Sequence, residues 1–344
     1  MGIIGKHSYR LENTPHIVSS ACYVGDKEGK GPMREYFDKI CKDDTLGLDS
    51  WEQAESRMFE SAVRVALAKI GKQSDDLSCL LGGDLLNQII SAGYAAREIR
   101  APFLGLYGAC STISEGLLVG GMLVDGGFLD LAACAASSHF SSAERQYRYP
   151  LEMGVQAVPT SQRTVTGAGS IIIKNSASMN DETDWFFKHI VITGGTIGSV
   201  EDYGITDANN MGAAMAPAAS ETICTHFRDY SSSPDDYDCI ITGDLGNFGS
   251  DMLYELCKKE GYDIKEKHED CGKMMFSEDQ NVNCGASGCG CAATIVSGYF
   301  LPQIERGVYN KVLFLATGAL LSPVSSLQGE SIPSIAHAVV LEHV

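Results

Sequence analysis

Basic residues and long apolar runs are what this 344-residue sequence has least of. No apolar run approaches the roughly 20 residues that cross a bilayer, so we expect no membrane-spanning helix. Lys and Arg total 26 against 44 Asp and Glu, a formal net charge of −18. That charge argues against nucleic acid as a partner and against electrostatic binding to an anionic membrane. The N-terminal segment MGIIGKHSYRLENT lacks the apolar core of a signal peptide, so we expect an intracellular protein.

Cysteine is abundant by contrast, with twelve residues. In an intracellular protein we expect reduced thiols that behave as small buried hydrophobes. A zinc site is the alternative, and its candidate ligands are His268, Cys271, Cys284, Cys289 and Cys291. The Cys-x4-Cys-x-Cys spacing does not fit a paired zinc knuckle. We therefore expect neither a metal nor a cofactor.

An internal repeat organises the chain. Asp235–Asn247 aligns without gaps on Asp75–Asn87, and both copies contain Gly-Asp-Leu-x-Asn. Two later matches follow in the same order, because Gly285-Ala286-Ser287 resembles Gly108-Ala109-Cys110, and Val312–Leu320 resembles Phe128–Ala136. Three ordered matches predict a doubled α/β unit. We expect halves at 1–180 and 185–344, related by a pseudo-twofold axis, with a site between their turns.

Several elements are predicted from local patterns. Apolar runs predict strands at 16–24, 128–136, 164–173 and 190–197, and Ser50 and Gln53 form a helix-capping pair. The segment 141–163, rich in Arg and Pro, breaks the periodicity and is an excursion from the scaffold.

Cys110 lies in a small-residue turn that leads into an apolar helix. The positive end of a helix favours thiolate over thiol, which is how a nucleophile is built. The same amides also bind carboxylates, so the turn is equally the floor of a pocket for a small anion.

A cysteine in this position of a doubled α/β fold resembles the thiolase superfamily, whose layers are arranged αβαβα. The run NVNCGASGCGCA (281–292) is similar to the thiolase Asn-x-Asn-Gly-Gly-Ala motif and the Gly-His-Pro that follows it. The departures affect catalysis, because Cys291 and Asp244 stand where the family has histidines and Ala316-Thr317-Gly318 replaces Cys-x-Gly. Claisen chemistry needs a base and oxyanion donors, and only the nucleophile position is retained.

Within that superfamily the chain resembles the stage V sporulation protein AD family. The matching stretches are VGDKEGKGP (24–32), SWEQAE (50–55), GACSTISEG (108–116), SSHFSSAERQYRYP (137–150) and TVTGAG (164–169). The resemblance implies a non-catalytic protein that binds dipicolinic acid, which is carried with calcium. It further implies a role with the membrane proteins of the same operon at the spore inner membrane, and a homodimer paired through 128–136.

Dipicolinate is a planar aromatic dianion that needs cationic or neutral donors and an apolar wall. The candidate ligand-binding residues are Cys110, His139, Arg145, Arg148, Arg163, Asp244, Asn247 and Ser287. His139 and the arginines are alternatively structural or solvated, and Asp244 and Asn247 are alternatively turn residues. Two other functions stay open, an acyltransferase that depends on Cys110 and a scaffold with an empty pocket.

Overall fold

Five described strands from each half follow one another in the same order along the main path of the sheet. The computed structural model describes residues 2–147, 158–178 and 185–344. The first half runs β3-β9-β7-β5-β6 and the second β10-β15-β14-β11-β12, linked where Val191 pairs with His16. The strands are β1 (Gly2–Ile4), β2 (Ser8–Arg10), β3 (His16–Val24), β4 (Lys39–Ile40), β5 (Cys79–Gly83), β6 (Phe103–Gly105), β7 (Leu131–Ser138), β8 (Arg163–Thr164), β9 (Gly167–Lys174), β10 (Ile190–Thr196), β11 (Cys239–Thr242), β12 (His268–Asp270), β13 (Ala286–Ser287), β14 (Lys311–Ala319) and β15 (Ser334–His343).

Strand directions repeat as well as strand order. In the first half β9 is antiparallel to both β3 and β7, and β5 is parallel to β7 and β6. In the second half β15 is antiparallel to β10 and β14, and β11 is parallel to β14 and β12. This correspondence confirms the doubled α/β unit predicted from the repeat. The segment 179–184, where the halves were predicted to divide, lies outside the described residues.

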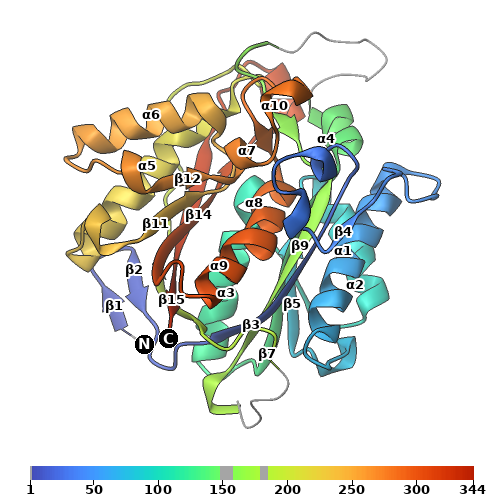
Figure 1. The fold of residues 1–344 in the computed structure, drawn as a ribbon. Coiled ribbons are helices and arrows are strands. Elements are labelled where there is room, and N and C mark those ends of the chain that lie inside the picture. Colours follow the sequence, from blue (N-terminus) through green and yellow to red (C-terminus); the bar gives the residue numbers. More distant parts are fainter. Residues whose placement is uncertain (1, 148–157, 179–184) are drawn as a thin grey trace.

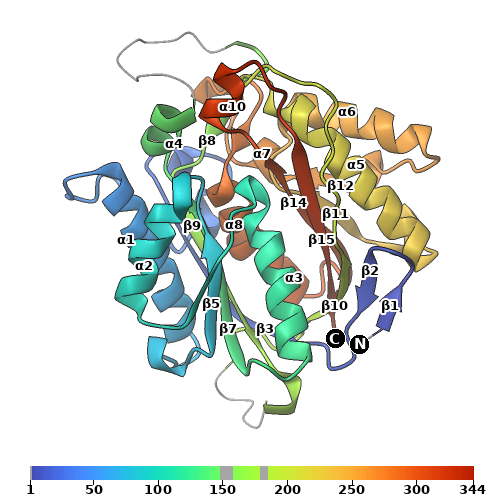
Figure 2. The same ribbon diagram turned by 180° about the vertical axis from the view of Figure 1, so that it is seen from behind.

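The helices form three layers around the strands (Figures 1 and 2). α3 and α8 lie between the two halves, α1 and α2 cover one outer face, and α5 and α6 cover the other. The result is the αβαβα arrangement. The helices are α1 (Trp51–Ala68), α2 (Ile90–Ile99), α3 (Thr112–Asp125), α4 (Phe140–Tyr147), α5 (Met211–Tyr230), α6 (Gly246–Lys259), α7 (Cys271–Met274), α8 (Cys289–Ile295), α9 (Leu301–Glu305) and α10 (Pro323–Leu327).

Burial explains why the central elements read as apolar runs. β7 is buried at every position, and α8 is likewise buried throughout, since each is covered on both sides. The amphipathic α1 instead starts with a cap, in which the Ser50 hydroxyl accepts from the Gln53 amide at 3.2 Å. All twelve cysteines are free and buried, as the composition predicts. In the described part of the chain, no helix is both long and apolar enough to cross a membrane.

Two predicted strands differ from the structure. The strand predicted at 128–136 is β7, which begins only at Leu131, because a turn through Gly127 leaves Phe128 79% exposed. The strand predicted at 164–173 is broken. Its first residues form β8, which leaves the main sheet and pairs in parallel with β13 of the other half. That break brings Thr164 next to Ser287, and both residues face the site described below.

The strand predicted to pair two copies is an internal strand of the sheet. β7 has β5 on one side and β9 on the other, so its backbone groups are already paired within the chain. Among the described strands of the first half, β6 is the edge strand, with β5 as its neighbour on one side. β7 therefore has no free edge at which a strand of a second copy could pair.

Candidate functional site

A cavity of about 310 Å³ lies between the two halves, at the turn that carries Cys110. Residues from both halves line it, namely Leu85, Asn87, Tyr107, Ala109, Cys110, Ala143, Tyr147, Thr164, Met211, Met215, Ser287, Ala319, Leu320, Leu321 and Ser322. Its volume is at the small end of the roughly 300–1,000 Å³ typical of ligand pockets. The site predicted between the repeated turns is therefore a real cavity.

The walls of the cavity are neutral. Two tyrosines and two methionines give broad apolar surfaces, while Asn87, Thr164, Ser287 and Ser322 supply hydroxyl and amide groups. The lining residues that the structure describes carry no formal charge. Such a lining suits a small, flat, partly polar molecule.

Close backbone approach holds the two halves together at the site. Gly318 in β14 lies so near the first half that a Cβ would be 2.3 Å from the Gly108 carbonyl oxygen. Gly288, just before α8, has φ +103°, and a Cβ there would be 2.8 Å from the Ser138 hydroxyl. Both positions require glycine. They bring the N-terminal ends of α3 and α8 to one place.

Asp244 is the residue that contacts Cys110. Its carboxylate accepts from the Gly288 amide at 2.9 Å and from the Thr317 hydroxyl at 2.9 Å. The Cys110 side chain lies beside the same carboxylate. Gln162 fixes the backbone of this turn, because its amide donates to the Asp244 carbonyl at 2.6 Å. The buried carboxylate thus accepts two hydrogen bonds and has the Cys110 thiol as a neighbour.

This contact determines the protonation of the cysteine. Burial raises the pKa of Cys110 well above its usual value, and the neighbouring Asp244 raises it further. Burial also raises the pKa of Asp244, to about 7. The prediction that the helix start favours thiolate is therefore wrong, since desolvation and a neighbouring carboxylate outweigh the helix end. Cys110 is a thiol.

The equivalent aspartate of the first half does different work. Asp84 accepts from the Leu86 and Ala92 amides, both at 2.7 Å, and so stabilises its own turn. In the second half that task belongs to Asp270, which accepts from the Leu245 and Gly246 amides at 2.8 and 2.9 Å. Asp244 is left to face Cys110. The repeat alone suggests two equivalent turn residues, and only one has that role.

The other predicted ligand residues are distributed as follows. Ser287 lines the cavity. His139 is buried away from it, with Nε2 2.9 Å from the Asp44 carbonyl oxygen and Nδ1 accepting from the Ser141 amide. Asn247 is exposed, and its backbone amide donates to the Cys284 carbonyl.

The described arginines also lie outside the cavity lining. Arg145 pairs with Glu52 and stacks over Trp51. Arg163 lies over the Phe140 ring with its guanidinium carbon 3.6 Å from the centroid. Arg148 lies outside the described residues.

Thirteen of the fifteen lining residues were not among the predicted site residues, and the largest of these are Tyr107, Tyr147, Met211 and Met215. Met211 and Met215 are one helical turn apart at the start of α5, which is a signal of a shared face. Tyr107 immediately precedes the small-residue turn, so the sequence itself indicates that it lies near Cys110. Tyr147 reaches the site only through the path of α4, where its hydroxyl donates to the Leu85 carbonyl.

Removing the charge of Asp244 is expected to make Cys110 more reactive. At pH 8 the carboxylate is mostly ionised, and a neighbouring charge shifts a pKa by about 1–3 units. Asp244→Asn should therefore speed alkylation of Cys110 by iodoacetamide roughly tenfold or more, measured by peptide mass mapping. The exposed Asp251→Asn serves as the control, and equal rates in the two variants would contradict the assignment.

Comparison with solved structures identifies the class of fold. The chain is similar to human mitochondrial 3-ketoacyl-CoA thiolase in complex with CoA (12% identity, 99% of this chain and 100% of that one, TM-score 0.61). It is also similar to 3-oxoacyl-[acyl-carrier-protein] synthase III from Aquifex aeolicus (13%, 95% and 99%, TM-score 0.57) and to Xanthomonas campestris OleA with cerulenin (14%, 96% and 97%, TM-score 0.59). The protein has a thiolase-like fold.

Sequence comparison identifies the family. Residues 5–342 match the family model described as stage V sporulation protein AD. The chain is 44% identical over 342 residues to stage V sporulation protein AD of Bacillus subtilis (strain 168), covering 99% of this chain and 98% of that protein. The chain belongs to the stage V sporulation protein AD family, as predicted, and has a role in sporulation.

Proposed function

We propose that this protein binds dipicolinic acid, pyridine-2,6-dicarboxylic acid, in the cavity at Cys110 and performs no chemistry on it. The observation that carries the proposal is the cavity itself. It is of a size for one small planar molecule, and it lies at Cys110, between the two halves. Membership in a sporulation family supports a ligand that is used during sporulation.

The lining suits an aromatic diacid. Tyr107, Tyr147 and the two methionines offer faces to the ring, while the hydroxyls of Thr164 and Ser287 can donate to its carboxylates. The neutral walls provide no cation for the two carboxylates of the ligand. Calcium bound together with the ligand would neutralise their charge. Asp244 is a poor calcium ligand here, since it is buried and already accepts from Gly288 and Thr317.

The state of the cysteine supports binding rather than catalysis. An acyl transfer needs a thiolate and a general base. Burial and Asp244 instead raise the pKa of Cys110. Thr317, whose hydroxyl donates to Asp244, carries no basic group that could accept the thiol proton. A negative carboxylate at this point also opposes a developing oxyanion.

The setting we propose is the spore inner membrane. There the protein would pass dipicolinic acid to the membrane proteins encoded in the same operon. It would act as a homodimer, and β6 offers the strand edge for pairing, with Leu104 and the adjacent Tyr107 46% and 50% exposed. Two β6 edges would place the two cavities on either side of a shared interface.

Calorimetric titration tests the proposal. We expect one molecule of dipicolinic acid per chain to bind, with and without calcium, and pyridine-3,5-dicarboxylic acid, of equal charge but different geometry, to bind at least tenfold more weakly. Absence of any heat of binding would favour the scaffold alternative. Transfer of label from an acyl-CoA to Cys110 in the wild type, absent in Cys110→Ala, would instead show an acyltransferase.

A further inference from the structure

Two thiols lie on either side of one hydroxyl group where α5 packs on α6, away from the cavity. Cys224 lies on α5 and Cys257 on α6, and both side chains are fully buried. The hydroxyl of Ser220 lies 4.0 Å from the Cys224 sulfur and 3.6 Å from the Cys257 sulfur. This shared contact brings the two thiols close together across the packing of the two helices.

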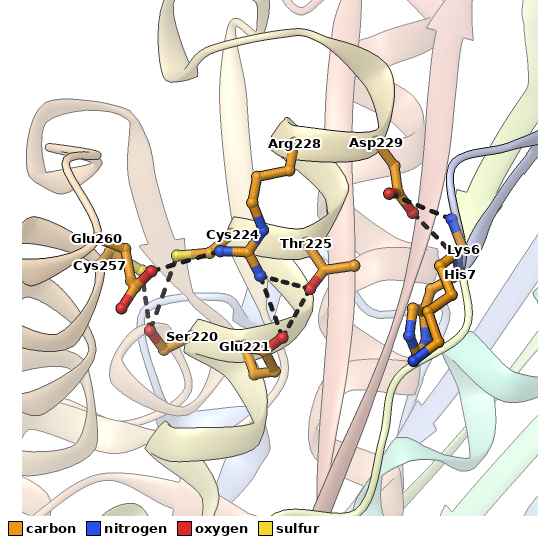
Figure 3. A network of polar contacts seen from close by, with 10 residues as sticks. All are labelled: Lys6, His7, Ser220, Glu221, Cys224, Thr225, Arg228, Asp229, Cys257 and Glu260. Carbon is orange, nitrogen blue, oxygen red and sulfur yellow. Dashed lines mark hydrogen bonds and ion pairs between the residues drawn. The ribbon is translucent and has the colours of Figure 1, made fainter.

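The surroundings fix this pair between two anchored helices (Figure 3). Arg228, one turn beyond Cys224, contacts Glu221 at 3.1 Å and Glu260 of the α6 end at 3.4 Å. Next to it, the Asp229 carboxylate accepts from the backbone amides of Lys6 and His7. The C-terminal turn of α5 is therefore tied on one side to α6 and on the other to the N-terminal segment.

The two sulfur atoms differ in their readiness to ionise. The neighbouring Cys257 lowers the pKa of Cys224, with Ser220 and the nearby Arg228 acting in the same direction. The neighbouring Cys224 and burial raise the pKa of Cys257, whose thiol donates to the Ser220 hydroxyl. One member of the pair is thus the better nucleophile, and the other holds its proton.

We propose that Cys224 and Cys257 form an oxidisable dithiol that closes to a disulfide between α5 and α6. With hydrogen peroxide as oxidant, the Cys224 sulfur attacks one peroxide oxygen, the O–O bond breaks, and a sulfenic acid and one water result. The Cys257 sulfur then attacks the sulfenic sulfur, and the hydroxyl leaves with the Cys257 proton as a second water. Two thiols and one peroxide give one disulfide and two waters.

Closure of the disulfide has a structural consequence. It covalently joins two helices that cover the same face of the second half, and it closes a loop that runs from 224 through β11 and Asp244 to 257. Such a crosslink stabilises chiefly by restricting the unfolded chain. Both sulfur atoms are buried, so the oxidant must be small, and a bulky disulfide reagent should not react.

The test is oxidation of the full chain with hydrogen peroxide, followed by alkylation and tryptic mapping. We expect a crosslink between the peptide ending at Arg228 and the peptide ending at Lys258, with a mass loss of about 2 Da for the two hydrogens. The oxidised protein should unfold roughly 5 °C higher than the reduced one. Cys224→Ser and Cys257→Ser should each abolish the crosslink and the shift.

Cys239→Ser serves as the matched control, because Cys239 is a buried thiol of β11 in the same half and should leave the crosslink intact. Survival of Cys224 and Cys257 as free thiols after prolonged oxidation would overturn the proposal. A crosslink that joins either residue to a different cysteine would overturn it equally. The unfolding temperature is compared before and after oxidation in each single variant that folds. Loss of either cysteine should be enough to remove the difference.

Discussion

Cys110→Trp is expected to abolish the binding of dipicolinic acid, with at least a hundredfold loss of affinity by calorimetry. Cys110 lies at the floor of the cavity, and an indole there would occupy much of its roughly 310 Å³. The loss should come from exclusion of the ligand rather than from a lost contact. Cys110→Ala, which leaves the space open, is expected to change the affinity by less than about threefold.

A second variant guards against misfolding of Cys110→Trp. Tyr107 is 50% exposed and lines the cavity, so Tyr107→Ala should fold and bind about tenfold more weakly through loss of one aromatic face. Tyr94→Trp, on the exposed side of α2, is the control for introducing an indole away from the cavity. Unchanged affinity in both Cys110→Trp and Tyr107→Ala would place the ligand elsewhere.

Asp270→Ala is expected to destabilise the protein by on the order of 4 kcal/mol, because it leaves several buried donors without an acceptor. The Asp270 carboxylate is 1% exposed and accepts from the amides of Leu245, Gly246 and Lys273 and from the Thr242 hydroxyl. An alanine cannot replace any of these bonds. Urea unfolding followed by circular dichroism measures the change.

Two further variants bracket this result. Asp270→Asn keeps one acceptor oxygen and should cost about half as much. The exposed Asp251→Ala on α6 should change the free energy of unfolding by less than about 0.5 kcal/mol. An Asp270→Ala protein within 1 kcal/mol of the wild type would show that water replaces the carboxylate.

The scaffold was predictable because its signals are local or repeated. β3 begins and ends where the apolar run does, and Ser50 caps α1 as its spacing indicates. The matching Gly-Asp-Leu turns predicted two copies of one unit, and the strand order repeats accordingly. Patterns of this kind depend on the residues within one element or on a second copy of it.

The site was only partly predictable because its contacts come from distant segments. Cys110 and Ser287 both line the cavity, and each lies in a turn that the repeat singles out. His139 was expected there because it ends a strand. The carbonyl of Asp44, far away in sequence, instead engages its ring. No residue near His139 in the sequence predicts the contact with Asp44.

Charge was the least predictable property. A dianionic ligand suggested arginines, but Arg145 is engaged by Glu52 and Arg163 by the Phe140 ring. Likewise, the start of a helix suggested a thiolate at Cys110, and only the fold shows that Asp244 lies against it. Whether burial or the helix end dominates the pKa of Cys110 depends on residues of the other half that pack against it.

The unequal roles of Asp84 and Asp244 show how a repeated unit produces an asymmetric site. Asp84 accepts from the amides of its own turn and so serves the fold alone. In the second half Asp270 of β12 accepts from the turn amides instead, which leaves the Asp244 carboxylate to the groups around Cys110. An acceptor supplied by a neighbouring strand therefore allows one copy of the turn to serve the cavity while the other copy stabilises only itself.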